Sequence, residues 1–172
     1  MRKVLIYITF SLFLAGCQTS ENIVPIDASF NPAEAQFINR NGDGEIRGQV
    51  FLSGESGHVH KGAGEIVRLI PASSYARQRF SRLYGGSKYV AIGDYPKATQ
   101  TDPNYIKYIR LTKTDASGRF RFDHVAPGNY YISSQVLWKK SGDARPQGGA
   151  MYDTVKITGQ EDGPVPVVVS GT

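Results

Sequence analysis

The chain has 172 residues, of which 20 are Lys or Arg and 15 are Asp or Glu, giving a formal net charge of +5. This mild excess excludes the dense basic face that nucleic-acid binding requires, so we expect no nucleic-acid partner. The single cysteine excludes an intrachain disulfide, so a domain of this length must be held together by an apolar core.

The start of the chain has the organisation of an export signal. Arg2 and Lys3 precede the apolar run Val4–Phe13, and the segment closes on Leu-Ala-Gly before Cys17. The run is too short to span a bilayer as a helix, which takes about 20 residues. A charged start, an apolar centre and a small-residue exit are typical of a secretory signal that is removed.

The Leu-Ala-Gly-Cys ending resembles the cleavage site of a bacterial lipoprotein signal peptide. The resemblance implies that residues 1–16 are removed and that Cys17 is acylated, with palmitate, to become the mature N-terminus. Inner-membrane lipoproteins typically carry Asp after this cysteine, whereas this chain has Gln18. The resemblance therefore implies a lipid-anchored protein of the outer membrane that faces the periplasm.

Residues 17–44 are predicted to be a polar tether between the anchored cysteine and the folded domain. The stretch is polar and ends in the turn-rich residues 39–44. Asn31 before a proline is typical of a helix start, so a short helix is expected over Pro32–Ile38. Its apolar residues Phe37 and Ile38 are expected to pack on the domain.

From Glu45 onward the hydrophobic pattern changes to a period of two, which is typical of half-buried strands. The strand candidates are short and are separated by Gly, Pro, Asn and Asp. This pattern predicts an all-β fold, a seven-stranded antiparallel β-sandwich over residues 45–172 with one helical insertion. The strands are expected at Glu45–Leu52, Ile66–Pro71, Lys107–Thr114, Arg119–Val125, Asn129–Trp138, Tyr152–Thr158 and Val165–Val169.

The insertion, residues 72–104, is too long for a bare loop inside a compact domain. Ser74 can cap a helix there, which is expected to pack over one edge of a sheet through Ala76, Phe80, Leu83 and Tyr84. No acidic residue lies within residues 66–93, so the helix either meets an anionic envelope surface or presents a solvated basic face. The residues that carry this charge are Arg77, Arg79, Arg82 and Lys88.

The clearest motif of the mature chain runs from Thr114 to Phe122, as TDASGRFRF. Asp115 can bond the backbone of the turn, and Gly118 can adopt the positive φ that closes a tight hairpin. Phe120 and Phe122 alternate with arginines, so both rings are expected to face the core.

The next turn contains Pro127 and Gly128, which fit the central positions of a type II turn, and Tyr130 begins the following inward face. Together the two motifs closely resemble the carboxypeptidase regulatory-like domain, a transthyretin-like (prealbumin-like) seven-stranded sandwich. The resemblance covers roughly residues 45–169, with residues 72–104 as the main departure. It implies a non-catalytic accessory module.

Two enzyme families share that architecture. Intradiol dioxygenases hold iron with two tyrosines and a His-x-His pair that follows the Pro-Gly-x-Tyr segment. In this chain His58 and His60 come before that segment, so the order differs. They are expected to lie in an exposed loop over residues 53–64. Hydroxyisourate hydrolases need core histidines and a Tyr-Arg-Gly-Ser terminus, which this chain lacks. His124 is expected to be an exposed turn residue. We therefore expect no catalytic residue, no metal site, no cofactor and no enzyme activity.

These observations favour a lipid-anchored envelope protein that binds or scaffolds a protein partner in the periplasm. The alternative is an accessory module that binds carbohydrate or peptidoglycan on exposed aromatic rings, and an iron enzyme comes last. A broad exposed apolar edge would favour the protein partner, and exposed coplanar rings would favour the glycan. The candidate rings are Tyr89, Tyr95, Tyr105, Tyr108 and Trp138, of which Trp138 is expected to finish the core.

Overall fold

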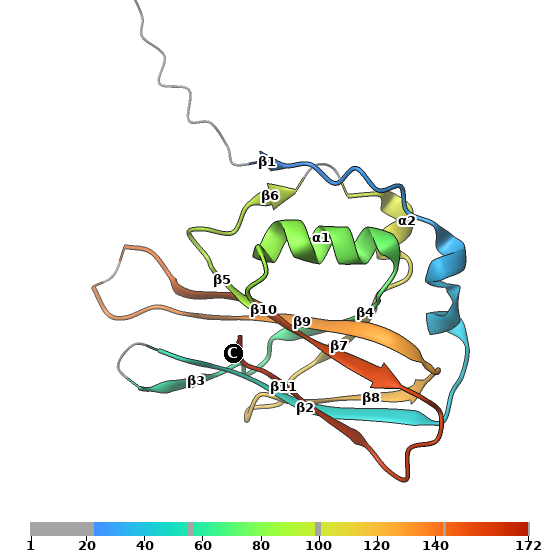
Figure 1. The fold of residues 1–172 in the computed structure, drawn as a ribbon. Coiled ribbons are helices and arrows are strands. Elements are labelled where there is room, and N and C mark those ends of the chain that lie inside the picture. The colour runs from blue at the N-terminus through green and yellow to red at the C-terminus, as the bar shows by residue number, and fades with distance from the viewer. Residues whose placement is uncertain (1–22, 55–56, 99–100, 143, 172) are drawn as a thin grey trace, which may run out of the picture.

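The structure is a computed structural model that describes residues 23–54, 57–98, 101–142 and 144–171. Two β-sheets face each other, and a helical layer covers the outer face of one of them (Figure 1). The all-β sandwich expected from the sequence is confirmed. The expected signal peptide and Cys17 lie outside the described residues. Within the described ranges, no helix is long and apolar enough to cross a membrane.

The larger sheet has five strands in the order β5-β10-β9-β4-β7. All of its neighbouring strands are antiparallel, and the long pair of β9 and β10 forms its centre. Its strands are β4 (Ile66–Pro71), β5 (Tyr89–Ala91), β7 (Arg110–Lys113), β9 (Gly128–Trp138) and β10 (Gln147–Ile157).

The smaller sheet is built around β2, which pairs with β8 along its first part and with β3 at its end. On its other side β2 pairs with β11, and this pair is parallel, which departs from the expected antiparallel pattern. Its strands are β2 (Gly44–Ser53), β3 (Val59–Lys61), β8 (Arg119–Val125) and β11 (Val165–Val169).

The main core lies between the two sheets and follows from the alternation along their strands. On β8, Phe120 and Phe122 are buried while Arg119 and Arg121, which alternate with them, are exposed, as the sequence predicts. On β9, Tyr130 and Ile132 are also buried. The Tyr130 hydroxyl donates a hydrogen bond of 2.7 Å to the backbone carbonyl of Ala126, so its one polar group is satisfied inside the core.

The turn between β7 and β8 forms at the predicted residues, but the two strands do not pair as the expected hairpin, because β7 lies in the larger sheet and β8 in the smaller one. Gly118 has a φ of 76°, a conformation that favours glycine. The carboxylate of Asp115 accepts hydrogen bonds from the backbone of Arg119 at 2.9 Å and of Ser117 at 2.7 Å. These bonds favour the charged form and hold the pKa of Asp115 below its usual value.

The expectation of a type II turn at Pro127-Gly128 is wrong. Gly128 begins β9 and does not have a positive φ; the left-handed residue near this corner is His124, with a φ of 54°. Glycine is needed at position 128 because a Cβ there would overlap the ring of Phe37. Phe37 also makes an edge contact with Tyr130, with ring centroids 5.3 Å apart, so its predicted packing on the domain is confirmed.

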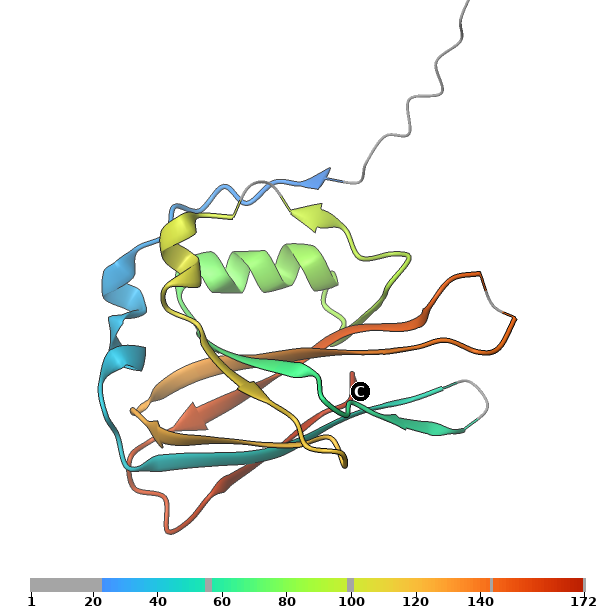
Figure 2. The same cartoon turned by 180° about the vertical axis from the view of Figure 1, so that it is seen from behind.

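The described part of the expected tether is part of the fold instead. β1 (Ile23–Val24) pairs with β6 (Lys97–Ala98), and two 3-10 helices, Pro32–Glu34 and Gln36–Asn39, take the place of the short helix. Phe30 of this segment is buried against the helical layer. The segment runs along the outside of the molecule (Figure 2). The segment is polar overall, which suggested a tether, but its interspersed apolar residues pack against the helical layer.

The helical layer consists of α1 (Ser74–Tyr84) and α2 (Pro103–Ile106). Ser73, rather than the expected Ser74, caps α1 by accepting a hydrogen bond of 3.2 Å from the amide of Ala76. The helix lies over the face of the larger sheet, not over an edge as expected (Figure 1). The ring of Phe80, on this helix, stacks on the ring of Tyr131 of β9 with centroids 4.1 Å apart.

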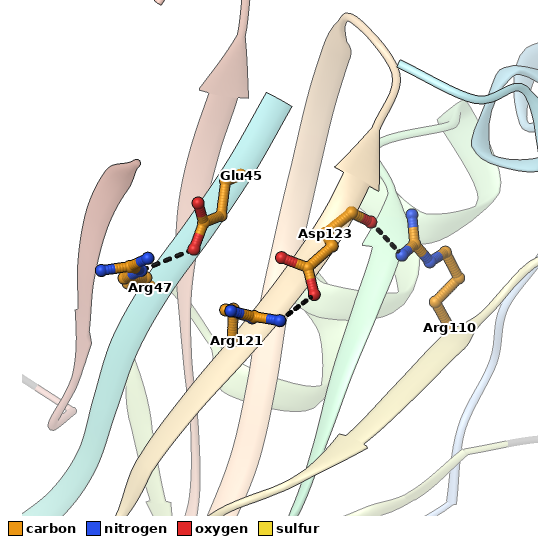
Figure 3. A network of polar contacts seen from close by, with 5 residues as sticks. All are labelled: Glu45, Arg47, Arg110, Arg121 and Asp123. Carbon is orange, nitrogen blue, oxygen red and sulfur yellow. Dashed lines mark hydrogen bonds and ion pairs between the residues drawn. The ribbon is translucent and has the colours of Figure 1, made fainter. Parts of the chain in front are cut away.

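Arg110 of β7 joins the edges of the two sheets. Its guanidinium donates a hydrogen bond of 2.5 Å to the backbone carbonyl of Asp123 (Figure 3). A second bond of 3.2 Å goes to the backbone carbonyl of His124, also on β8. The side chain of Asp123 forms an ion pair of 2.9 Å with Arg121. Both partners of that pair are largely exposed, so the pair itself contributes little to stability. Arg110 is therefore a structural bridge between the sheets.

Candidate functional site

A cleft of about 580 Å³ lies between α1 and the outer face of the larger sheet. Its volume falls within the range of small-molecule sites, roughly 300–1,000 Å³. The sheet supplies one side of the cleft through residues of β4, β9 and β10. These residues include Arg68, Ile70, Ser133, Gln135 and Ala150.

Aromatic residues form much of the opposite side. Tyr84 of α1 meets Tyr95 edge to face, with ring centroids 5.9 Å apart. Burial, the largest cause, and the side chain of Tyr95 together raise the pKa of Tyr84 well above its usual value. The Tyr84 hydroxyl therefore stays neutral and can act as both hydrogen-bond donor and acceptor. Tyr95 itself is exposed, so its ring is available at the mouth of the cleft.

Two arginines line the cleft. Arg79 comes from α1, and its guanidinium carbon lies 5.8 Å from the ring centroid of Tyr105, within cation–π range. Its Nη1 atom is buried and has no hydrogen-bond partner among the described residues. Arg68 comes from the exposed face of β4, where its strand neighbours are Ser133 and Leu111. None of the described residues that line the cleft is Asp or Glu, so the cleft is positively charged.

The structure separates the four basic residues that the sequence grouped together. Arg79 lines the cleft, whereas Arg77 and Arg82 are exposed. Arg77 donates a hydrogen bond to the backbone carbonyl of Ala72. Lys88 forms an ion pair of 2.9 Å with Asp153, an acid that lies far along the sequence. Binding of an anionic surface by these four residues stays a prediction, but they do not share one role in the fold.

The five aromatic rings proposed as a glycan platform are also separated. Tyr95 and Tyr105 line the cleft, but Tyr105 is buried and only Tyr95 is exposed. Tyr89, Tyr108 and Trp138 pack against the main core, which agrees with the expectation for Trp138. The rings therefore do not form one flat platform, and the aromatic surface of the cleft combines Tyr95 with rings from α1.

The histidines occupy positions that the sequence only partly predicts. His60 lies on β3 rather than in an exposed loop, and its ring stacks on Trp138 with centroids 3.8 Å apart. His124 is exposed as expected but lies at the end of β8 rather than in a turn. Among the described residues, no three His, Cys, Asp or Glu side chains gather as the ligands of a metal ion would.

Sequence reasoning did not assign a site role to Arg68, Tyr84, Ser133 or Gln135. A usable signal was present, because all but Tyr84 occupy outward-facing positions of strands in the sheet that carries the insertion. Polar side chains on the sheet face beneath an inserted helix are candidates for a cleft lining. That inference requires knowing that the helix covers a face, and the sequence suggested an edge instead.

Comparison with known proteins identifies a similar solved structure. No family model and no curated protein matches this chain. The chain is similar to the crystal structure of a putative carbohydrate binding protein from Pseudomonas aeruginosa, with a TM-score of 0.68 and 30% sequence identity. The similarity covers 83% of this chain and 98% of that chain. With this identity and coverage, the protein belongs to the same family as that Pseudomonas aeruginosa protein.

Proposed function

We propose that the protein is a non-catalytic carbohydrate-binding module of the bacterial envelope, and that the cleft between α1 and the larger sheet is its binding site. The observation that carries the proposal is the combination of an exposed aromatic ring, Tyr95, with polar side chains of the sheet in one cleft. The name given to the Pseudomonas aeruginosa relative supports the same class of ligand.

The lining suits a sugar for a physical reason. A sugar ring has an apolar face of C–H groups and a rim of hydroxyls, so it needs an aromatic surface beside hydrogen-bonding groups. Tyr95 supplies the ring, and Ser133 and Gln135 of β9 supply donors and acceptors. Gln135 is exposed, so its amide is free to turn toward a ligand.

The same lining supports binding rather than catalysis. None of the described residues around the cleft is His, Cys, Asp or Glu, the residues that most often act as nucleophile, general acid or general base. The two buried tyrosines of the lining, Tyr84 and Tyr105, are kept neutral because burial raises the pKa of each hydroxyl. A bound sugar would therefore meet hydrogen-bonding and cationic groups, but no residue suited to cleave its glycosidic bond.

The protein-partner interpretation has less support. Ile66 of β4 and Leu111 of the edge strand β7 are exposed apolar residues. Their strand neighbours are Lys113 and Arg68, so charges interrupt the apolar surface along this described edge. Single exposed apolar residues are normal in folded proteins. A protein partner in the periplasm stays a prediction from the sequence.

The proposed location rests on the N-terminal motif. Acylation of Cys17 would hold the β-sandwich at the membrane surface, and the outer-membrane location facing the periplasm follows from the resemblance to lipoproteins. There the cleft would meet peptidoglycan or a polysaccharide that passes through the periplasm during export.

The proposal can be tested by screening the full chain against an array of neutral and acidic oligosaccharides and by sedimentation with purified peptidoglycan. Tyr95→Ala and Gln135→Ala should each weaken binding about tenfold or more, because each removes a direct contact at an exposed position. Gln36→Ala is the matched control, since Gln36 is exposed on the second 3-10 helix, outside the cleft.

Both cleft variants should keep the melting temperature of the unchanged protein, because the residues are exposed. The proposal is overturned if no glycan binds, or if Tyr95→Ala and Gln135→Ala bind as tightly as Gln36→Ala.

A further inference from the structure

We propose that the ligand of the cleft is an acidic sugar, a glycan containing hexuronic acid, whose carboxylate is bound by Arg79 and Arg68. This inference rests on the proposed carbohydrate-binding function and defines its substrate class. It follows from the charge of the cleft and from one buried atom whose bonding is incomplete.

The buried atom that lacks a hydrogen-bond partner is Nη1 of Arg79. It is buried and has no hydrogen-bond partner among the described residues. Burying a charged donor without a partner is costly, and nearly all buried polar groups in folded proteins are paired. The Tyr105 ring 5.8 Å away attracts the guanidinium, but the face of a ring does not replace a hydrogen-bond acceptor. Arg79 lines the cleft, so a turn of its guanidinium would bring this unpaired donor to a ligand.

The preferred partner of such a donor is an anion. Guanidinium groups bind carboxylates through two parallel hydrogen bonds, and such charge-assisted bonds are stronger than neutral ones. Arg68 adds a second guanidinium to the lining, and the described lining has no acidic residue that could neutralise either. The ring against which Arg79 lies belongs to Tyr105, which is neutral because burial raises the pKa of its hydroxyl. A carboxylate on the ligand would therefore supply the missing acceptor.

The rest of the lining indicates what carries the carboxylate. Ile92 and Ile106 are exposed apolar residues beside Tyr95, so one part of the ligand meets an apolar surface. Ser133 and Gln135 face another part with neutral hydrogen-bonding groups. A hexuronic acid combines a C–H face, hydroxyls and one carboxylate in a single ring. A bare inorganic anion would leave the apolar and neutral groups of the cleft unused.

The decisive experiment compares an oligogalacturonide with its methyl ester, binding each to the full chain by calorimetry. Esterification keeps the sugar backbone and removes only the negative charge. We expect the acid to bind about 10–100-fold more tightly than the ester, as for a lost charged hydrogen bond. Binding of the acid should weaken as salt rises, whereas binding of the ester should not.

Variants then assign the effect to Arg79. Arg79→Met retains an unbranched apolar stem and removes the guanidinium, so it should strongly reduce the preference for the acid over the ester. Its melting temperature should be unchanged or higher, because an incompletely bonded buried charge is replaced by an apolar group. Arg82→Met is the matched control, since Arg82 is exposed on the same helix and lies outside the cleft lining. Arg68→Gln should weaken binding of the acid and reduce its salt dependence.

The outcomes separate the two proposals. Equal binding of acid and ester, with loss of both in Tyr95→Ala, overturns the acidic-sugar inference and leaves the carbohydrate function standing. Binding of neither, together with a negative glycan array, overturns both. If inorganic phosphate binds as tightly as the oligogalacturonide, the arginines form only a general anion site and the inference is wrong. The comparison of acid with ester needs no variant, so it holds even if Arg79→Met fails to fold.

Discussion

Gly48 of β2 and Phe120 of β8 are direct cross-strand partners, and the ring of Phe120 covers the space where a side chain at position 48 would lie. A Cβ at Gly48 would overlap that ring and would also come within 2.7 Å of Cγ1 of Val167. An aromatic ring that covers a glycine on the neighbouring strand restores packing that the glycine alone would lose. The pair therefore joins β2 to β8 through side-chain packing as well as through backbone pairing.

This packing predicts a specific coupling between the two positions. Gly48→Ala should lower the free energy of unfolding by about 1–3 kcal/mol, because it overfills a packed core. Phe120→Ala should cost about 3–5 kcal/mol as a large-to-small change in the core. In a Phe120→Leu background Gly48→Ala should cost less, since the overlapping ring is gone. The coupling is measured by urea unfolding of the unchanged protein, Gly48→Ala, Phe120→Leu and the double variant. Strictly additive effects would contradict the contact.

The stacked rings of His60 and Trp138 give a second prediction. The two rings are nearly parallel, at 6°, and join β3 of the smaller sheet to the end of β9 in the larger sheet. His60→Ala should destabilise the protein by roughly 0.5–1.5 kcal/mol. It should also shift the fluorescence emission to longer wavelength, because the ring of Trp138 loses its cover. The measurement is specific because the chain has one tryptophan.

The control for this prediction lies on the same strand. Val59→Thr alters an exposed, β-branched residue next to His60, so it should leave both the emission maximum and the melting temperature nearly unchanged. An emission spectrum that is the same in His60→Ala and in the unchanged protein would show that the stacked arrangement does not persist in solution.

The strands that the sequence located well are those in which burial alternates with a period of two. Arg119–Val125 and Val165–Val169 were placed with their observed bounds, because both have one buried and one exposed face. The start of β10 was missed by five residues. That start contains Gly148 and Gly149, which do not look like strand residues, but a side chain at Gly149 would overlap the backbone of β5. Close approach of a neighbouring strand is a tertiary property that the periodicity does not record.

The candidate site was less accessible to sequence reasoning. The pattern of α1 identified Phe80, Leu83 and Tyr84 as a buried face, and the structure confirms this. Arg79 was placed with the exposed arginines, although it lies three residues after Ala76 and four before Leu83, beside that face. A long side chain can turn along the helix surface, and Arg79 reaches the ring of Tyr105 on α2. The spacing could therefore have set Arg79 apart from the other arginines, but its contact with Tyr105 depends on the position of α2, which the spacing does not show.

The proposed anchor predicts how the protein fractionates. Several acyl chains on Cys17 would hold the protein stably on membranes, whereas one chain binds only marginally. Cys17→Ser should therefore release the protein into the soluble fraction or leave an uncleaved precursor. Membrane fractionation and mass spectrometry of the N-terminal peptide measure both results. A variant that is cleaved at the same bond and still sediments with membranes would rule out the anchor.

A hydrogen-bonded carboxylate in the turn between β10 and β11 should make the stability of the protein depend on pH. The carboxylate of Glu161 accepts hydrogen bonds from the Thr158 hydroxyl at 2.6 Å, the Thr158 amide at 2.5 Å and the Gly159 amide at 3.0 Å. These bonds, that of the Thr158 hydroxyl foremost, lower the pKa of Glu161 from 4.5 to about 2. A pKa lowered on folding means that the ionised carboxylate stabilises the native state.

The stabilisation from Glu161 should be complete above pH 4.5 and should disappear as the pH falls toward 2, through the pKa of the folded state. Glu161→Gln should therefore melt at a lower temperature than the unchanged protein at pH 7, and the difference should shrink across this window. Comparing the two proteins at each pH removes the contribution of Asp115, whose pKa is also lowered and which is present in both. Asp162→Asn is the control, because Asp162 is exposed beside Glu161 and should leave the melting temperature at pH 7 nearly unchanged. A difference between Glu161→Gln and the unchanged protein that stays constant from pH 7 to pH 2 would show that the charge of Glu161 does not stabilise this turn.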